Sequence, residues 1–284
     1  MPHEIGFVEN AGTLAHYMML DKIKTFAEAN GYTILRYDTA IANRELIMMA
    51  PGFSGTEEIY MGFRCYQNAG ADYYNMTVAA FIGYVPGNSF ETQPGAMLSG
   101  IPAHNNRIDY WLTLNPQRIA LAMKVGTPVY ESAYVGKFLP YASPGQFPLP
   151  IVCAGMLSGE PATRFSDVTH SIPYKGSRGN FLMRFNTGSW IQPSAWPWNN
   201  VYIARQGTST QQSELRDVEG YYSLHKVMLT GSGNIYGELD GISYISGFNN
   251  AVENTLEINS ESYVVIQDVS RTGFIDYYAM RLDD

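Results

Sequence analysis

The chain has 284 residues, of which 45% are hydrophobic and only 15% are charged. Its 18 Lys and Arg against 26 Asp and Glu give a formal net charge of −8. This length allows one large domain or two smaller ones. The acidic balance excludes a protein that coats nucleic acid, because neutralising phosphates requires a cationic face. The apolar content excludes a disordered chain, and the 13% of aromatic residues favours a surface that other chains cover.

The sequence shows no sign of export, of a membrane span or of a disulfide framework. No basic region precedes the apolar stretch at the N-terminus, so we expect no secretory signal. The longest uncharged run, residues 138–159, contains four prolines that break any helix, which excludes a membrane-spanning segment. Cys65 and Cys153 lie far apart without a motif, as is typical of buried thiols in a protein that folds in a reducing cytosol.

Residues 10–30 carry the one convincing amphipathic helix. Asn10 is the expected N-cap, and Asn30-Gly31 supplies a left-handed stop. One face of the helical wheel is apolar and must lie on something apolar. That face consists of His16, Met19, Leu20, Ile23, Phe26 and Ala27.

The period changes after the helix. Short runs rich in aromatic and β-branched residues, at 32–38, 44–50, 57–66 and 73–84, have the spacing of a β-meander. A helix followed by a meander predicts an α+β unit with the helix across one face of the sheet. Residues 85–106 are rich in Gly and Pro and predict a long loop or arm.

The rest of the chain predicts further strands and hairpins. Strands are expected at 107–114, 118–126, 129–139, 151–157 and 180–185.

Two hairpins are expected near the C-terminus. One joins residues 235–239 to 242–246 through Asp240-Gly241, and the other joins 263–270 to 274–282. The run 263–266 is apolar on both sides, so we expect cover on both of its faces.

These patterns predict a β-rich α+β fold. An N-terminal helix packs on an antiparallel meander, and a β-sandwich-like or barrel-like middle and C-terminal region follows. We expect an α+β domain over residues 1–106, completed by the hairpin within 251–284 lying beside the N-terminal meander. Residues 107–250 form a β-rich region that contains a proline-rich arm at 138–150 and a Trp-rich loop at 189–200.

No pattern of residues predicts catalysis, a metal or another cofactor. The five histidines, at positions 3, 16, 104, 170 and 225, have no partner at metal-ligand spacing and are expected to be satisfied or interface histidines. No nucleophile elbow, zinc-binding helix or phosphate-binding glycine loop occurs. Ser54 lies between two expected strands in a plain hairpin loop. Acidic pairs such as Glu57 and Glu58 are expected to be solvated, so the chain is expected not to be an enzyme.

The Trp-rich loop leaves three interpretations open. Trp190, Trp196 and Trp198 fall within nine residues and are stiffened by two prolines. They suit stacking on sugar rings, as in a lectin, or anchoring in a pocket of a neighbouring subunit. The third interpretation is a self-packed loop that plugs a sheet edge.

The proline-rich arm leaves two interpretations open. Its prolines fix φ and remove backbone donors, so it cannot join the interior of a sheet. It either straps its own domain or reaches across to a neighbouring subunit with little loss of entropy. The interface candidates in it are Phe138, Tyr141, Phe147 and Leu149.

Several segments resemble virion structural proteins of tailed bacteriophages. They contain recurring sequence patterns of strands and loops rather than catalytic signatures, so no functional residue is carried over from that family to this chain. The segments are residues 31–39, 58–95, 129–156, 188–199 and 236–283.

The resemblance implies a non-enzymatic subunit of the neck (a head-completion, collar or tail-terminator ring) or of the tail. Its expected partners are copies of itself in a symmetric ring, other neck, tail or baseplate proteins, and DNA passing through an acidic channel without specific binding. The expected location is the virion, and the host cytoplasm during assembly. The alternative is a baseplate or tail-tip component that binds a receptor or carbohydrate. A third hypothesis, a polysaccharide or peptidoglycan hydrolase, lacks an arranged acid, base or nucleophile.

Overall fold

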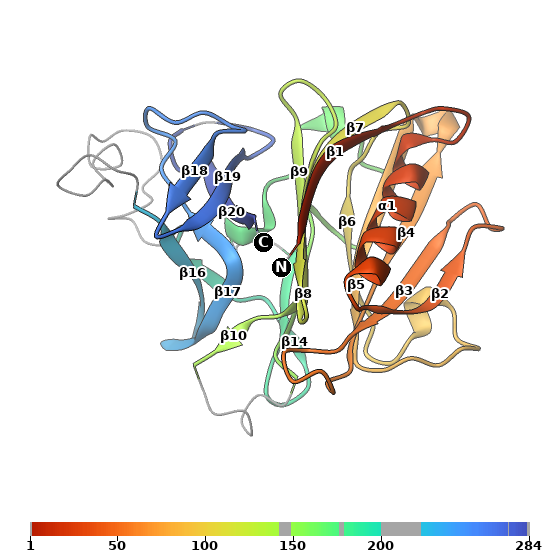
Figure 1. Cartoon of the computed structure of the whole chain (residues 1–284), viewed down its shortest axis with the longest axis horizontal. Coiled ribbons are helices and arrows are strands. Elements are labelled where there is room, and N and C mark those ends of the chain that lie inside the picture. The colour runs from red at the N-terminus through yellow and green to blue at the C-terminus, as the bar shows by residue number, and fades with distance from the viewer. Residues whose placement is uncertain (1, 142–148, 176–178, 200–222, 272, 283–284) are drawn as a thin grey trace.

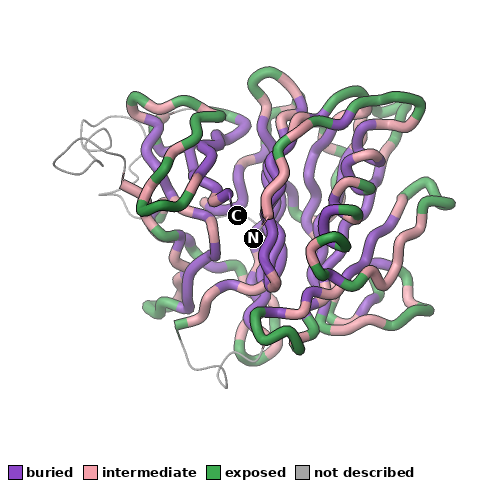
Figure 2. Tube along the Cα trace, viewed as in Figure 1, coloured by how far each residue is buried: buried purple, intermediate pink, exposed green. Residues whose placement is uncertain are grey.

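A computed structural model describes residues 2–141, 149–175, 179–199, 223–271 and 273–282 (Figure 1). Three antiparallel sheets lie in succession, and we name them the meander sheet, the central sheet and the C-terminal sheet. Helix α1 (Ala15–Ala29) contacts strands of the first two. Buried residues fill the sheets, while exposed residues gather at the loops and on the outer side of α1 (Figure 2). The expected β-rich α+β fold is confirmed.

The meander sheet has the order β12-β6-β5-β4-β3-β2. Its strands are β2 (Thr33–Asp38), β3 (Glu45–Ala50), β4 (Ile59–Asn68), β5 (Tyr73–Phe81), β6 (Met97–Ile101) and β12 (Leu157–Ser158). Alternate residues of β3, β4 and β5 face α1 and the central sheet, as the period-2 pattern requires. Both cysteines are free and buried, as expected.

The central sheet has the order β1-β7-β8-β9-β11-β13-β14. Its strands are β1 (His3–Glu9), β7 (Arg107–Asn115), β8 (Arg118–Lys124), β9 (Tyr130–Lys137), β11 (Ile151–Ala154), β13 (Phe181–Arg184) and β14 (Trp190–Ile191). Strand β9 contacts β4 and β5 on one side, and Ser132 on β9 meets Tyr278 of the C-terminal sheet on the other at 2.7 Å. This sheet is therefore buried on both faces over most of its width.

The C-terminal sheet has the order β15-β16-β17-β20-β19-β18, and β10 also pairs with β17. Its strands are β10 (Leu139–Pro140), β15 (Ser194–Trp196), β16 (His225–Gly231), β17 (Asn234–Tyr244), β18 (Thr255–Ile258), β19 (Glu261–Gln267) and β20 (Tyr277–Leu282). Short 3-10 turns are η1 (Ala69–Ala71), η2 (Phe90–Thr92), η3 (Phe165–Asp167) and η4 (Pro173–Lys175). No helix in the described ranges is long and apolar enough to cross a membrane.

The helix begins later than the sequence predicts. Its N-cap is Leu14, and Asn10 instead accepts a hydrogen bond from the backbone N–H of Gly12 at 3.1 Å. The backbone N–H groups of Asn10 and Ala15 donate to the loop before β7, which holds the first residues of the segment out of the helix. The stop at Gly31, with φ of +87°, and the buried apolar face are confirmed.

Residues 85–106 were expected to be a long loop or arm, and the structure shows a loop that packs on its own sheet rather than an arm. They contain β6, and η2 folds back over the outer face of the meander sheet. There Phe90 is fully buried edge-on to Phe81, with ring centroids 5.3 Å apart. The outer face carries apolar side chains of β3 and β5 that need this cover.

Two predictions about the C-terminal region are corrected. Asp240-Gly241 is not a hairpin turn: β17 continues through it, because the Asp240 side chain is buried in contacts to other strands. The hairpin β19–β20 pairs with β17 rather than lying beside the N-terminal meander. Cover on both faces of residues 263–266 is confirmed, since Val264 and Ile266 join the main core while Tyr263 and Val265 join a second cluster.

Candidate functional site

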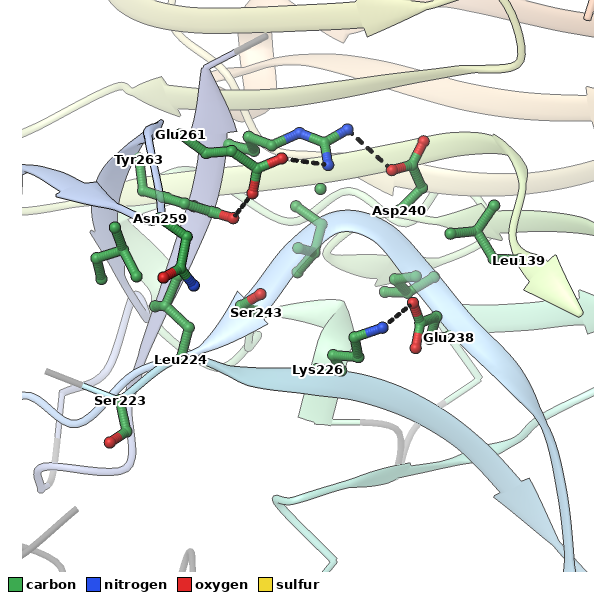
Figure 3. Close-up of a pocket in the computed structure, with 15 residues that line it drawn as sticks. Leu139, Ser223, Leu224, Lys226, Glu238, Asp240, Ser243, Asn259, Glu261 and Tyr263 are labelled. Atoms are coloured by element: carbon green, nitrogen blue, oxygen red, sulfur yellow. Dashed lines mark hydrogen bonds and ion pairs between the residues drawn. The ribbon is translucent and has the colours of Figure 1, made fainter. Parts of the chain in front are cut away.

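A pocket of about 600 Å³ opens on the C-terminal sheet where β17 bends (Figure 3). Residues of β17 form its floor, and β16, β18, β19 and β20 contribute the walls. The lining residues are Leu139, Ser223, Leu224, Lys226, Glu238, Leu239, Asp240, Gly241, Ile242, Ser243, Ile258, Asn259, Glu261, Tyr263 and Arg281. The pocket therefore combines apolar side chains such as Leu239 and Ile242 with several charged groups.

The bend of β17 depends on one glycine and one buried arginine. Gly241 has φ of +75°, and a Cβ there would lie 2.3 Å from Nη2 of Arg118. The Arg118 side chain is fully buried and reaches from β8 of the central sheet, with Nε 3.6 Å from Oδ2 of Asp240. The strand can lie directly on the guanidinium only because residue 241 has no side chain.

Asp240 is the point where the two sheets are joined beneath the pocket. Its carboxylate accepts a hydrogen bond from the Asn115 amide and lies 3.0 Å from Nη2 of Arg281 on β20. The side chain of Asp240 is 7% exposed. Charge-assisted hydrogen bonds of this kind are the strong ones, so the pocket floor is rigid.

The remaining charges of the pocket are also paired. Lys226 lies 2.7 Å from Glu238, and Tyr141 donates to the same carboxylate at 2.5 Å. Tyr263 donates to Glu261 at 2.6 Å, and Arg281 lies 3.5 Å from that residue (Figure 3). Burial and the bond to Glu238 raise the pKa of Tyr141 to about 12, so its hydroxyl stays protonated. Carboxylate and hydroxyl groups among apolar side chains suit a ligand that carries several hydroxyl or amino groups.

A second polar cluster is buried between the central and C-terminal sheets. Nε2 of His170 lies 2.7 Å from Oε1 of Glu131, and both side chains are almost completely buried. Nearby, Asp268 accepts hydrogen bonds from the Ser171 hydroxyl and the Ile172 N–H and pairs with Lys175 at 2.7 Å. These contacts fasten residues 170–175 between the sheets, which is a structural role.

We predict that Glu131→Gln changes the pH dependence of stability. Burial raises the pKa of Glu131 from 4.5 to about 7, although the bond to His170 opposes the rise. The folded protein holds this proton more tightly than the unfolded chain, so the stabilisation is full below pH 4.5 and is lost as the pH rises through about 7. The variant has no carboxyl group at this position and does not lose this stabilisation. Between pH 4.5 and about 7 its free energy of unfolding should therefore rise by about 3 kcal/mol relative to that of the native chain.

Urea unfolding of the native chain and the variant between pH 4.5 and 8 measures this difference. Glu28→Gln is the control, because Glu28 is exposed on α1 and its side chain pairs with Lys24 in the same helix. Parallel stability profiles for the native chain and Glu131→Gln would contradict the prediction.

The structure separates the residues of the proline-rich arm. Phe138 is fully buried in the chain's own core, so it is not available to a partner. Leu139 and Pro140 form β10, which pairs with β17. The prolines were expected to keep this segment out of a sheet interior, and β10 lies off the main strand order. A missing backbone donor is tolerated there. Tyr141 is 53% exposed beside the pocket, and Leu149 packs partly buried against the core. Phe147 lies outside the described residues.

The three tryptophans of the Trp-rich loop are half-buried against their own chain. Trp190 on β14 donates to the Gly95 carbonyl at 3.1 Å, and Trp198 donates to the Ile275 carbonyl at 2.8 Å. Trp196 on β15 lies edge-on to His225. Because β14 and β15 are edge strands of two different sheets, these contacts favour the self-packed interpretation.

Sequence reasoning missed the residues that form the pocket and the buried clusters. The Asp240-Gly241 dipeptide predicted a turn and nothing more. Arg118 and Glu131 lie in strands that were predicted from their apolar residues, so neither charged residue was noticed. Glu131 bonds His170 across 39 positions and Asp240 bonds Asn115 across 125, separations that no local pattern can reveal. Among the described residues, no group of three or more His, Cys, Asp or Glu could hold a metal ion.

Comparison with known proteins assigns the chain to no family. No family model matches the chain, and no curated protein matches it significantly.

Proposed function

We propose that this chain is a non-enzymatic structural subunit of a tailed-phage virion, in the neck (a head-completion, collar or tail-terminator ring) or the tail. It assembles with copies of itself in the host cytoplasm and then resides in the particle. The observation that carries the proposal is the outer strand β1. It forms one edge of the central sheet and carries Ile5 and Phe7, which are 51% and 52% exposed. An uncovered strand with large apolar side chains is suited to pairing with another chain.

Two further features support assembly rather than a solitary protein. The segments that resemble virion proteins cover nearly half of the chain. The acidic balance suits the wall of a channel, because negative charge keeps passing DNA from sticking. Light scattering of the purified chain measures its oligomeric state, and mass spectrometry of purified particles tests whether the chain is present in them. We expect the chain in the particles, and its absence from them would overturn the proposed function.

A second candidate is a baseplate or tail-tip component that binds a carbohydrate, and the pocket favours it. Glu261 and Tyr263 present a carboxylate and a hydroxyl at its rim, groups that pair with sugar hydroxyls. Glu261→Gln should then abolish binding on a glycan array without loss of folding. Trp196→Ala is the matched comparison, because it tests the Trp-rich loop instead. Absence of any glycan signal for the native chain would eliminate this candidate.

A further inference from the structure

The edges of the three sheets are not equivalent. Strand β1 has seven residues and stays in register with β7 along its whole length. The edge strand β2 contains a register shift, and its Arg36 side chain is tied to the carbonyls of Pro86 and Asn88. The other edge strands, β12, β14, β15 and β18, have two, two, three and four residues. Within the described strands, β1 is therefore the longest regular sheet edge, and Figure 1 shows it outermost in the central sheet.

The two faces of β1 have different roles. Glu4 faces α1, where it lies 2.9 Å from Lys22 and accepts a hydrogen bond from Tyr110 at 2.8 Å. Ile5 and Phe7 point to the opposite face and are half exposed. The Arg107 guanidinium lies 4.0 Å from the centre of the Phe7 ring. The apolar face is thus fixed in place without being covered.

We propose that β1 pairs antiparallel with β1 of a second copy of this chain, about a two-fold axis at Gly6. In this register Ile5 lies opposite Phe7 of the other copy, so the two exposed apolar residues cover each other. His3 lies opposite Glu9, which places a basic ring beside a carboxylate at each end. The strand is complementary to itself, which is what a two-fold contact requires.

Other registers match less well. Moving the axis to Phe7 places Glu9 opposite Ile5, and moving it to Ile5 places His3 opposite Phe7. Each shift keeps a single apolar pair, that of the axis residue with itself, in place of two, and it loses the pairs of His3 with Glu9. The central register keeps them, and Glu4 remains neutralised by Lys22 on the far face.

This pairing rests on the proposed function, because it names a surface through which copies of the chain associate. It is tested on the purified chain. A seven-residue strand buries less area than a stable dimer of standard size, so we expect association only at high concentration. A two-fold contact also does not close a ring, so it adds to the head-to-tail contact that a ring needs.

Cysteine cross-linking tests the register. Residues directly opposite in an antiparallel pair have Cα atoms about 4.5–5.5 Å apart, within the range that a disulfide spans. A mixture of Ile5→Cys and Phe7→Cys chains should therefore cross-link several-fold faster than either variant alone, because identical positions lie diagonally at about 7–8 Å. The native Cys65 and Cys153 are buried and do not compete.

Sedimentation at rising concentration tests the apolar contact. Phe7→Lys should abolish the dimer, whereas Phe53→Lys, which changes a similarly exposed phenylalanine in a loop away from β1, should leave it intact. Circular dichroism confirms that each variant folds. A native chain that stays monomeric, equal cross-linking in the single variants, or equal loss in both lysine variants would each overturn the inference. A dimer in a protein absent from particles would overturn the proposed function alone.

Discussion

Asp240→Ala should lower the free energy of unfolding by about 3–5 kcal/mol. The carboxylate lies beneath the pocket, where it joins β8 and β20 through Arg118 and Arg281. Removing it takes the acceptor from the Asn115 amide and the negative charge from beside the fully buried Arg118 guanidinium. A buried charge that loses its partner keeps its full desolvation cost, which is why the loss exceeds that of an ordinary hydrogen bond.

Glu261→Ala is the matched control for this variant. Glu261 also pairs with Arg281, but its side chain is 48% exposed and the distance is 3.5 Å. Exposed pairs contribute little, so we expect a loss below about 1 kcal/mol. Urea unfolding of both variants at neutral pH measures the difference. Similar losses in the two variants would show that Asp240 is not the point that joins the sheets.

Gly136→Ala should cost about 3 kcal/mol or more, through two independent effects. Gly136 lies on β9 in the middle of the central sheet, with φ of +125°. A Cβ there would lie 2.2 Å from the carbonyl oxygen of Gln117 and 2.5 Å from Cα of Arg118. Both are backbone atoms at the start of β8 and in the turn before it, so the contact is relieved only by moving β8 away from β9.

Gly12→Ala isolates the backbone part of this cost. Gly12 has φ of +100°, yet nothing lies within 4 Å of the position that its Cβ would occupy. Its loss should be about 1–2 kcal/mol, the cost of positive φ alone. Thermal unfolding of the two variants separates conformational strain from steric overlap. Equal melting temperatures would mean that the strands accommodate the added methyl group.

The elements with a clear local period were predictable from the sequence. The apolar face of α1 and the alternation in β3, β4 and β5 are confirmed, because burial of one face imposes its period on the residues. Strand β1 was missed, since His3, Gly6 and Glu9 interrupt its pattern and one of its faces is uncovered. An edge strand with a single packed face needs fewer apolar residues and gives a weaker signal.

The site was far less predictable than the fold. Asp240-Gly241 has the residues of a tight turn, but the tertiary structure uses the same dipeptide to bend a continuous strand over Arg118. The glycine provides positive φ in both cases, so local sequence cannot distinguish them. The deciding contact comes from Arg118, far away in the chain.

By itself the sequence determined that this chain is a β-rich α+β protein with one N-terminal helix. Period and composition are local properties, and they follow from which face each element buries. Only the tertiary structure decided that the last hairpin joins β17, that Glu131 meets His170, and that β1 stands at an open edge. Those outcomes depend on pairings between distant strands. Their energies come from desolvation and contact across sheets, which leave no period in the sequence.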